Sequence, residues 1–95
     1  GRGDGAVIDL GTILTKNPNA AYRVYDGQAT VVLPDRSEVH VLNPIGTTVW
    51  DRIDGRHTLA QILDAVIEEY TVAPDEAQRD VLAFIADLRN HGMVS

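Results

Sequence analysis

Three short runs of strand-forming residues begin at residue 21. The first run, 21–25 (AYRVY), is followed at 26–27 by Asp-Gly, a dipeptide typical of tight hairpin turns. The second run, 28–33 (QATVVL), leads into the turn-forming PDRS at 34–37, and the third run is 38–42 (EVHVL). This pattern predicts a three-stranded antiparallel meander.

The side chains of the third run alternate between two faces of the predicted strand. Val39 and Val41 share one face of the predicted strand, while Glu38, His40 and Leu42 share the other. A strand at the edge of a small sheet can accept an extended peptide as an additional strand. The third run is therefore a candidate for peptide binding.

Three helical segments follow, and each has a start signal. An Asn-Pro pair at 43–44 supplies an N-cap and a first helical residue, and Gly55 ends that helix. A capping box at 58–61 starts the second helix, Pro74 starts the third, and Gly92 closes it. The apolar stripes that these starts introduce are Ile45, Val49, Trp50 and Ile53; Leu59, Ile62, Leu63, Val66, Ile67 and Tyr70; and Ala77, Val81, Phe84, Ile85 and Leu88.

The resulting order is three strands followed by three helices (β-β-β-α-α-α). Short helices with tight connections beside a small sheet are typical of an α+β, winged helix-turn-helix-like domain. We expect this domain to occupy residues 20–95. Residues 1–19 are expected to form a partly disordered N-terminal segment, with disorder at Gly1–Gly5.

The charge of the chain narrows the choice of partners. The net charge is −6, and the single Lys and seven Arg are scattered, so the chain is poorly suited to neutralising nucleic-acid phosphates. Cysteine is absent, which excludes disulfides and thiolate metal sites. Neither a run of about 20 apolar residues nor a secretory signal is visible. We expect a cytoplasmic protein with no membrane and no nucleic-acid partner.

Candidate catalytic residues are few. The imidazoles are His40, His57 and His91, and no two of them have metal-ligand spacing such as i, i+4 on a helix. The acidic pairs at 68–69 and 75–76 fit a solvated helix face and a helix start. No phosphate-binding loop or G-x-S-x-G motif is present. We therefore expect no enzyme activity, no cofactor and no metal site.

One apolar residue of the third helix lies off the centre of its stripe. Leu82 is about 100° from Val81 around the helix, and Gln78, Ala86 and Arg89 lie on its flank. In one interpretation Leu82 widens the core face. In the other, this flank and an edge strand form the two walls of a groove for an extended peptide.

Several short motifs stand in a characteristic order along residues 21–95. They are an Asp-Gly turn, Leu-Asn before a Trp-bearing helix, a second Asp-Gly, Tyr-x-Val, and Asp-Val-x-x-Phe-Ile-x-x-Leu ahead of a glycine. Here these motifs comprise Asp26, Gly27, Leu42, Asn43, Trp50, Asp54, Gly55, Tyr70, Val72, Asp80, Val81, Phe84, Ile85, Leu88 and Gly92. Their order and spacing resemble the PqqD-like family, which comprises pyrroloquinoline quinone biosynthesis D proteins and related RiPP precursor-peptide recognition elements.

The resemblance implies a non-enzymatic role. Such domains bind the leader of a ribosomally made precursor peptide, which adds as a strand to the third β-strand, beside the third helix. These domains present the bound leader to a modifying enzyme, often a radical-SAM protein or a peptidase/cyclase. By position, and with the helix flank chosen from Leu82, the peptide-binding residues would be Glu38, Val39, His40, Val41, Leu42, Gln78, Leu82, Ala86 and Arg89.

Two other uses of the same fold stay open at this point. A winged helix could serve as a DNA-binding or general protein-interaction module, although the second helix is acidic. The open edge of the sheet could also pair two copies of the chain into a homodimer.

Overall fold

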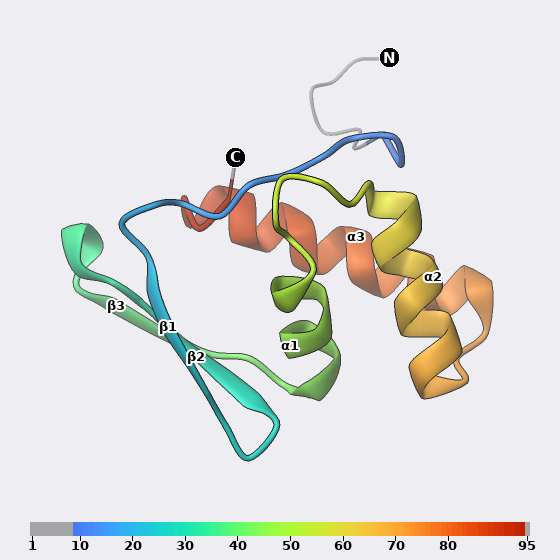
Figure 1. Cartoon of the computed structure of the whole chain (residues 1–95), viewed down its shortest axis with the longest axis horizontal. Helices are drawn as coiled ribbons and strands as arrows, with labels where there is room; N and C mark the ends of the chain where they lie inside the picture. The colour runs from blue at the N-terminus through green and yellow to red at the C-terminus, as the bar shows by residue number, and fades with distance from the viewer. Residues whose placement is uncertain (1–8, 95) are drawn as a thin grey trace.

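The computed structural model describes residues 9–94, so the disorder expected at Gly1–Gly5 lies outside the described residues. An antiparallel sheet stands at one side of the molecule and three helices at the other (Figure 1). The predicted α+β order is confirmed. The elements are β1 (Ala21–Tyr25), β2 (Gln28–Leu33), the 3-10 turn η1 (Pro34–Arg36), β3 (Glu38–Val41), α1 (Pro44–Asp51), α2 (Leu59–Tyr70) and α3 (Pro74–Asn90).

The sheet has the strand order β1-β2-β3, so β3 is an edge strand. Asp26 and Gly27 both have positive φ angles, 56° and 78°, as a tight hairpin between β1 and β2 requires. On the central strand, Ala29, Val31 and Leu33 are buried. These three side chains form the sheet's share of the core.

The corner between β3 and α1 is fixed by polar side chains. The N–H of Leu42 donates to the carbonyl of Ala29 at 2.8 Å, and the N–H of Ala29 donates to Thr47 Oγ1 at 2.8 Å. Asn43 caps α1, because its Oδ1 accepts from the N–H of Gly46 at 2.7 Å. The Thr47 side chain of α1 thus accepts the hydrogen bond from Ala29 at the point where the β2–β3 pairing ends.

The stripe of α1 fills the centre of the core. Val49, Trp50 and Ile53 are buried, and Ile45 is half-buried against them. The Trp50 ring is fully buried and meets the Tyr22 ring edge-on, with the centroids 5.5 Å apart. Trp50 therefore joins the first helix to the sheet, as the sequence pattern predicted.

The expected end of the first helix at Gly55 is wrong. The α1 helix ends at Asp51, because the Arg52 N–H already closes it by donating to the Val49 carbonyl at 3.1 Å, and Gly55 lies in the loop that follows.

The predicted starts of α2 and α3 are present. Thr58 Oγ1 accepts from the N–H of Gln61 at 3.2 Å, and Gln61 Oε1 accepts from the N–H of Thr58 at 2.8 Å. This is the reciprocal capping box expected for α2. The third helix begins at Pro74, and Gly92 follows it with φ of +71°.

The described part of the N-terminal segment, residues 9–19, packs against the ends of the helices. Leu14 is buried in the core, and its carbonyl accepts from the N–H of Gly55 at 3.0 Å. Lys16 Nζ donates to the carbonyl of Ile53 at 2.8 Å, and Lys16 forms an antiparallel bridge with Val94. These residues are therefore part of the packed structure. Within the described residues, no helix combines the length and apolar character that a membrane span needs.

Asp54 organises the loop between α1 and α2. Its carboxylate accepts from the N–H groups of Arg56 and His57, and it lies 3.0 Å from the His57 ring nitrogen Nδ1. The bond with the His57 side chain is the main cause that lowers the pKa of Asp54 to about 2 from 3.8, and the two backbone bonds act in the same direction. The fold therefore favours ionised Asp54.

We expect Asp54→Asn to lower the melting temperature at pH 7. A carboxyl with a depressed pKa in the folded state contributes stability above its unfolded pKa, here 3.8, and loses it as pH falls through about 2. The difference from wild type should therefore shrink below pH 4 and vanish near pH 2 in thermal melts. Asp64→Asn, at an exposed position on α2, is the control and should change little at either pH. An equal cost at both pH values would contradict this role.

Candidate functional site

The outer edge of β3 carries free backbone groups. The N–H of Leu42 donates to β2, and in an antiparallel ladder every second residue points its backbone the same way. His40 and Glu38 therefore also direct their N–H and carbonyl groups to β2, whereas Val39 and Val41 direct theirs to the open edge. Among the described strands β3 has a neighbour on one side only, so these backbone groups lie at an unpaired edge, and the two valines are 63% and 66% exposed.

The side chains of β3 divide between two faces. His40 lies opposite Val31, and Glu38 lies opposite Leu33; both of these β2 partners are buried. Because paired residues share a face, Glu38 and His40 point inward, and the two valines point outward. The sequence predicted the alternation, and the structure assigns the inward face to the polar pair.

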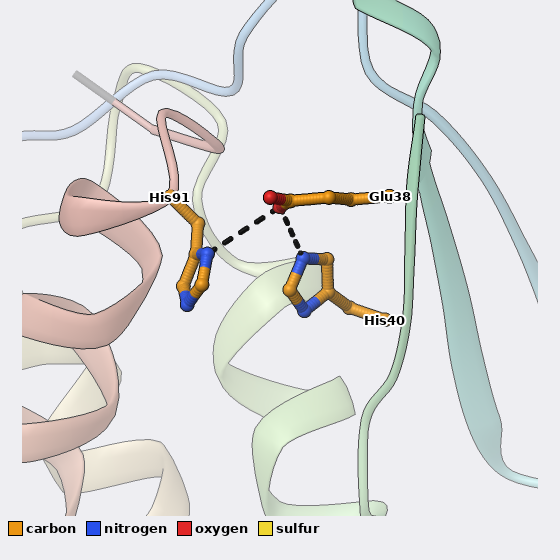
Figure 2. A group of neighbouring side chains, drawn as sticks. All are labelled: Glu38, His40 and His91. Carbon is orange, nitrogen blue, oxygen red and sulfur yellow. Dashed lines mark hydrogen bonds and ion pairs between the residues drawn. The ribbon is translucent and has the colours of Figure 1, made fainter. Parts of the chain in front are cut away.

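A side chain from the end of α3 reaches this inward face. Figure 2 shows His91 extending toward Glu38, with His40 on the other side of the carboxylate. Glu38 Oε1 lies 3.0 Å from His40 Nε2 and 3.4 Å from His91 Nδ1, and the two imidazole centroids are 4.8 Å apart. We call Glu38, His40 and His91 the β3–α3 cluster, because they span the space between these elements.

The electrostatics of the cluster favour a carboxylate at its centre. The hydrogen bond with His40 is the largest cause that holds the pKa of Glu38 below its ordinary value, against partial desolvation. The charges of His91, His40 and Arg36 act in the same direction as that bond. An ionised Glu38 between two imidazoles can accept hydrogen bonds from a ligand or contribute to binding a cation.

Phe84 belongs to the same flank of α3. A Cβ placed on Gly46 would lie 3.1 Å from Phe84 Cζ, so this ring packs directly on the first turn of α1, just after β3. Phe84 and His91 are seven residues apart, which is about two helical turns. Asp87 lies on this flank too, with its Oδ1 3.5 Å from His91 Nε2. The α3 flank that faces β3 therefore contains Phe84, Asp87 and His91.

The structure places the expected helix wall on the other flank of α3, and its role in peptide binding stays a prediction. Leu82 is two residues from Phe84, about 200° around the helix, and it is half-buried against the core. The residues expected to form the helix wall of a groove beside β3 share this other flank: Gln78, Leu82, Ala86 and Arg89. A stripe of buried residues has two flanks, and only the packing of α3 against α1 and β3 decides which one meets the sheet.

The β3 part of the expected site, Glu38–Leu42, stays a prediction as a peptide-binding surface. Within this strand the structure separates two kinds of contact. Val39 and Val41 offer backbone groups, whereas Glu38 and His40 offer side chains. The approach of His40 to His91 was not predicted. The two residues are distant in the chain, and helical or strand periodicity says nothing about such a contact.

A second surface feature lies on the opposite face of the sheet. A hollow of about 520 Å³ is lined by Ala21, Tyr22, Arg23, Tyr25, Thr30 and Val32. The exposed side chains of Val39 and Val41 lie on the same face as Val32 and Thr30, which they oppose in the sheet. This face combines apolar side chains with Arg23 and Thr30, and it is separate from the β3–α3 cluster.

Comparison with known proteins gives one family. The family model described as Coenzyme PQQ synthesis protein D (PqqD) matches residues 29–94. A search among curated proteins found no match.

Two solved structures share the fold. The structure of TbiB1 in complex with the TbiA(beta) leader peptide has a TM-score of 0.79 at 18% identity, covering 85% of this chain and 94% of that one. Lasso peptide synthetase B1 complexed with the leader peptide has a TM-score of 0.78 at 21% identity, covering 88% of this chain and 99% of that one.

Proposed function

The chain belongs to the PqqD family, and from this membership we propose that it binds the leader of a ribosomally made precursor peptide and presents it to a modifying enzyme. Both similar structures are complexes with a leader peptide, which supports this partner. The chain itself acts by binding, and the chemistry belongs to the partner enzyme, either a radical-SAM protein or a peptidase/cyclase.

The observation that carries the proposal is the open edge of β3. The leader adds there as a fourth strand and pairs with the outward N–H and carbonyl groups of Val39 and Val41. Each such hydrogen bond contributes a net of about 0.5–1.5 kcal/mol, and this contribution does not depend on the peptide sequence. Selectivity therefore comes from side-chain contacts.

Alternate side chains of an added strand point toward α3. At one end they meet the half-buried Phe84 ring, which packs on Gly46 of α1. At the other end they meet the β3–α3 cluster with its ionised Glu38. This arrangement favours a leader that places an apolar residue near Phe84. It also favours a hydrogen-bond donor or a cation near Glu38.

The proposal is tested by titrating the isotope-labelled chain with the leader of a precursor encoded beside its gene. Amide shifts should concentrate on β3 and the C-terminal half of α3 and spare α2. Sedimentation of the free chain checks whether the same edge already pairs two copies. Shifts confined to α2, or binding of duplex DNA in place of the leader, would contradict the proposal.

A matched pair of variants then locates the side-chain contact. Phe84 and Leu82 are both half-buried on α3 but lie on opposite flanks. We expect Phe84→Ala to weaken leader binding by about tenfold or more, because truncating an aromatic anchor commonly costs over ~1 kcal/mol. Leu82→Ala should leave the affinity within about twofold in calorimetric titrations. If Leu82→Ala weakens binding and Phe84→Ala does not, the leader contacts the Leu82 flank of α3 instead.

A further inference from the structure

The β3–α3 cluster places three metal-ligating side chains around one point. Oε1 of Glu38, Nε2 of His40 and Nδ1 of His91 lie within 4.8 Å of one another, with two of the separations at 3.0 and 3.4 Å. All three residues are half-buried, so water and ions reach them. Both imidazoles face the same carboxylate from different elements (Figure 2).

Two of these separations fit a zinc site. Ligand atoms at about 2.0–2.1 Å from a tetrahedral Zn²⁺ are about 3.3 Å from one another. The two Glu38 distances already bracket this value. The third pair of ligand atoms, His40 Nε2 and His91 Nδ1, lies within 4.8 Å, so zinc binding requires these two rings to move closer together.

The surroundings of His91 favour a metal on its Nδ1 atom. Nδ1 faces Glu38 at 3.4 Å, and Nε2 faces Asp87 at 3.5 Å. A neutral imidazole has a single N–H and can donate to only one of these carboxylates. With a metal at Nδ1, the proton sits on Nε2 and is donated to Asp87. This is the carboxylate–histidine–metal arrangement common in zinc sites.

We propose that Glu38, His40 and His91 bind a zinc ion, with water at the fourth position and Asp87 orienting His91. Two imidazole nitrogens and one carboxylate oxygen suit Zn²⁺ better than Mg²⁺ or Ca²⁺, which prefer oxygen ligands. The ligands come from both β3 and the end of α3, so the ion ties the edge strand to the last helix.

The direct test is calorimetric titration of the chain, free of any polyhistidine tag, with zinc chloride at neutral pH. We expect saturation at one ion per chain and no comparable response to magnesium chloride. Asp87→Asn should weaken zinc binding by about 10–100-fold, the usual effect of losing a carboxylate behind a metal-bound histidine. His40→Ala and His91→Ala should each weaken it more than this, and Glu38→Gln provides an independent ligand variant.

His57 gives a matched control. Its ring also lies 3.0 Å from a carboxylate, that of Asp54, but it is not part of the cluster. Its side chain is 44% exposed, against 24% for His40 and 37% for His91. His57→Ala should therefore bind zinc like the wild type. Zinc should shift the ring signals of His40 and His91 in NMR spectra but not those of His57. It should also raise the melting temperature by about 5 °C or more, because it binds the folded state.

Two results would overturn the proposal. The first is an absence of saturable zinc binding by the wild-type chain. The second is binding that persists in both His40→Ala and His91→Ala, or that falls equally in His57→Ala, because the ion would then be held by scattered surface groups. Circular dichroism of each variant establishes that affinity is compared between folded chains.

Discussion

Trp50→Ala should lower the free energy of unfolding by about 3–5 kcal/mol, the usual cost of removing a large buried aromatic ring. The Trp50 ring is fully buried, meets Tyr22 edge-on, and has the Lys16 ammonium 5.2 Å from its centre. Small domains have total stabilities of about 5–15 kcal/mol, so this single change removes much of the fold's stability. The melting temperature should fall by more than about 10 °C.

Two further variants make the Trp50 measurement specific. Tyr25→Ala removes another aromatic ring, but Tyr25 is 79% exposed on the hairpin and should change stability by less than about 0.5 kcal/mol. Trp50→Phe should cost less than Trp50→Ala, because the buried Nε1 atom has no hydrogen-bond partner to lose among the described residues. An unchanged melting temperature for Trp50→Ala would mean that α1 does not place this ring in the core.

The parts of the fold that follow local rules were predictable. The Asp-Gly hairpin, the Asn43 cap and the capping box at Thr58 each depend on residues within a few positions of one another. The burial of Trp50 followed from helical periodicity once the start of α1 was known. The order of the short motifs along the chain indicated the family, which no single helix or strand indicates.

The geometry of the candidate site was less predictable because it depends on packing between distant segments. The buried stripe of α3 has one flank with Phe84 and another with Leu82, and amphipathicity does not distinguish them. The contact between the His40 and His91 rings can be inferred only once the end of α3 is known to lie beside β3. Residues 9–19 showed no period, because they are held mainly by backbone hydrogen bonds and bury the single side chain of Leu14 completely.

The proposed strand addition predicts a large loss of leader binding in Val41→Pro. The N–H of Val41 points away from β2, so proline removes no bond of the existing sheet, and edge strands tolerate proline at such positions. The preceding residue, His40, is already in the extended conformation that a following proline requires. Stability should therefore change by less than about 1 kcal/mol, the order of a single net hydrogen bond.

Leader binding depends on the group that Val41→Pro removes. A leader carbonyl that pairs with this N–H would be left buried without a partner, which costs about 1–3 kcal/mol. The affinity should therefore fall by about 10–100-fold, since each 1.4 kcal/mol is a factor of ten. Val41→Thr keeps the N–H and the β-branched shape, and it should bind the leader like the wild type. If Val41→Pro instead binds with wild-type affinity in calorimetric titrations, the leader does not pair with this edge, and the outer face of the sheet becomes the surface to test.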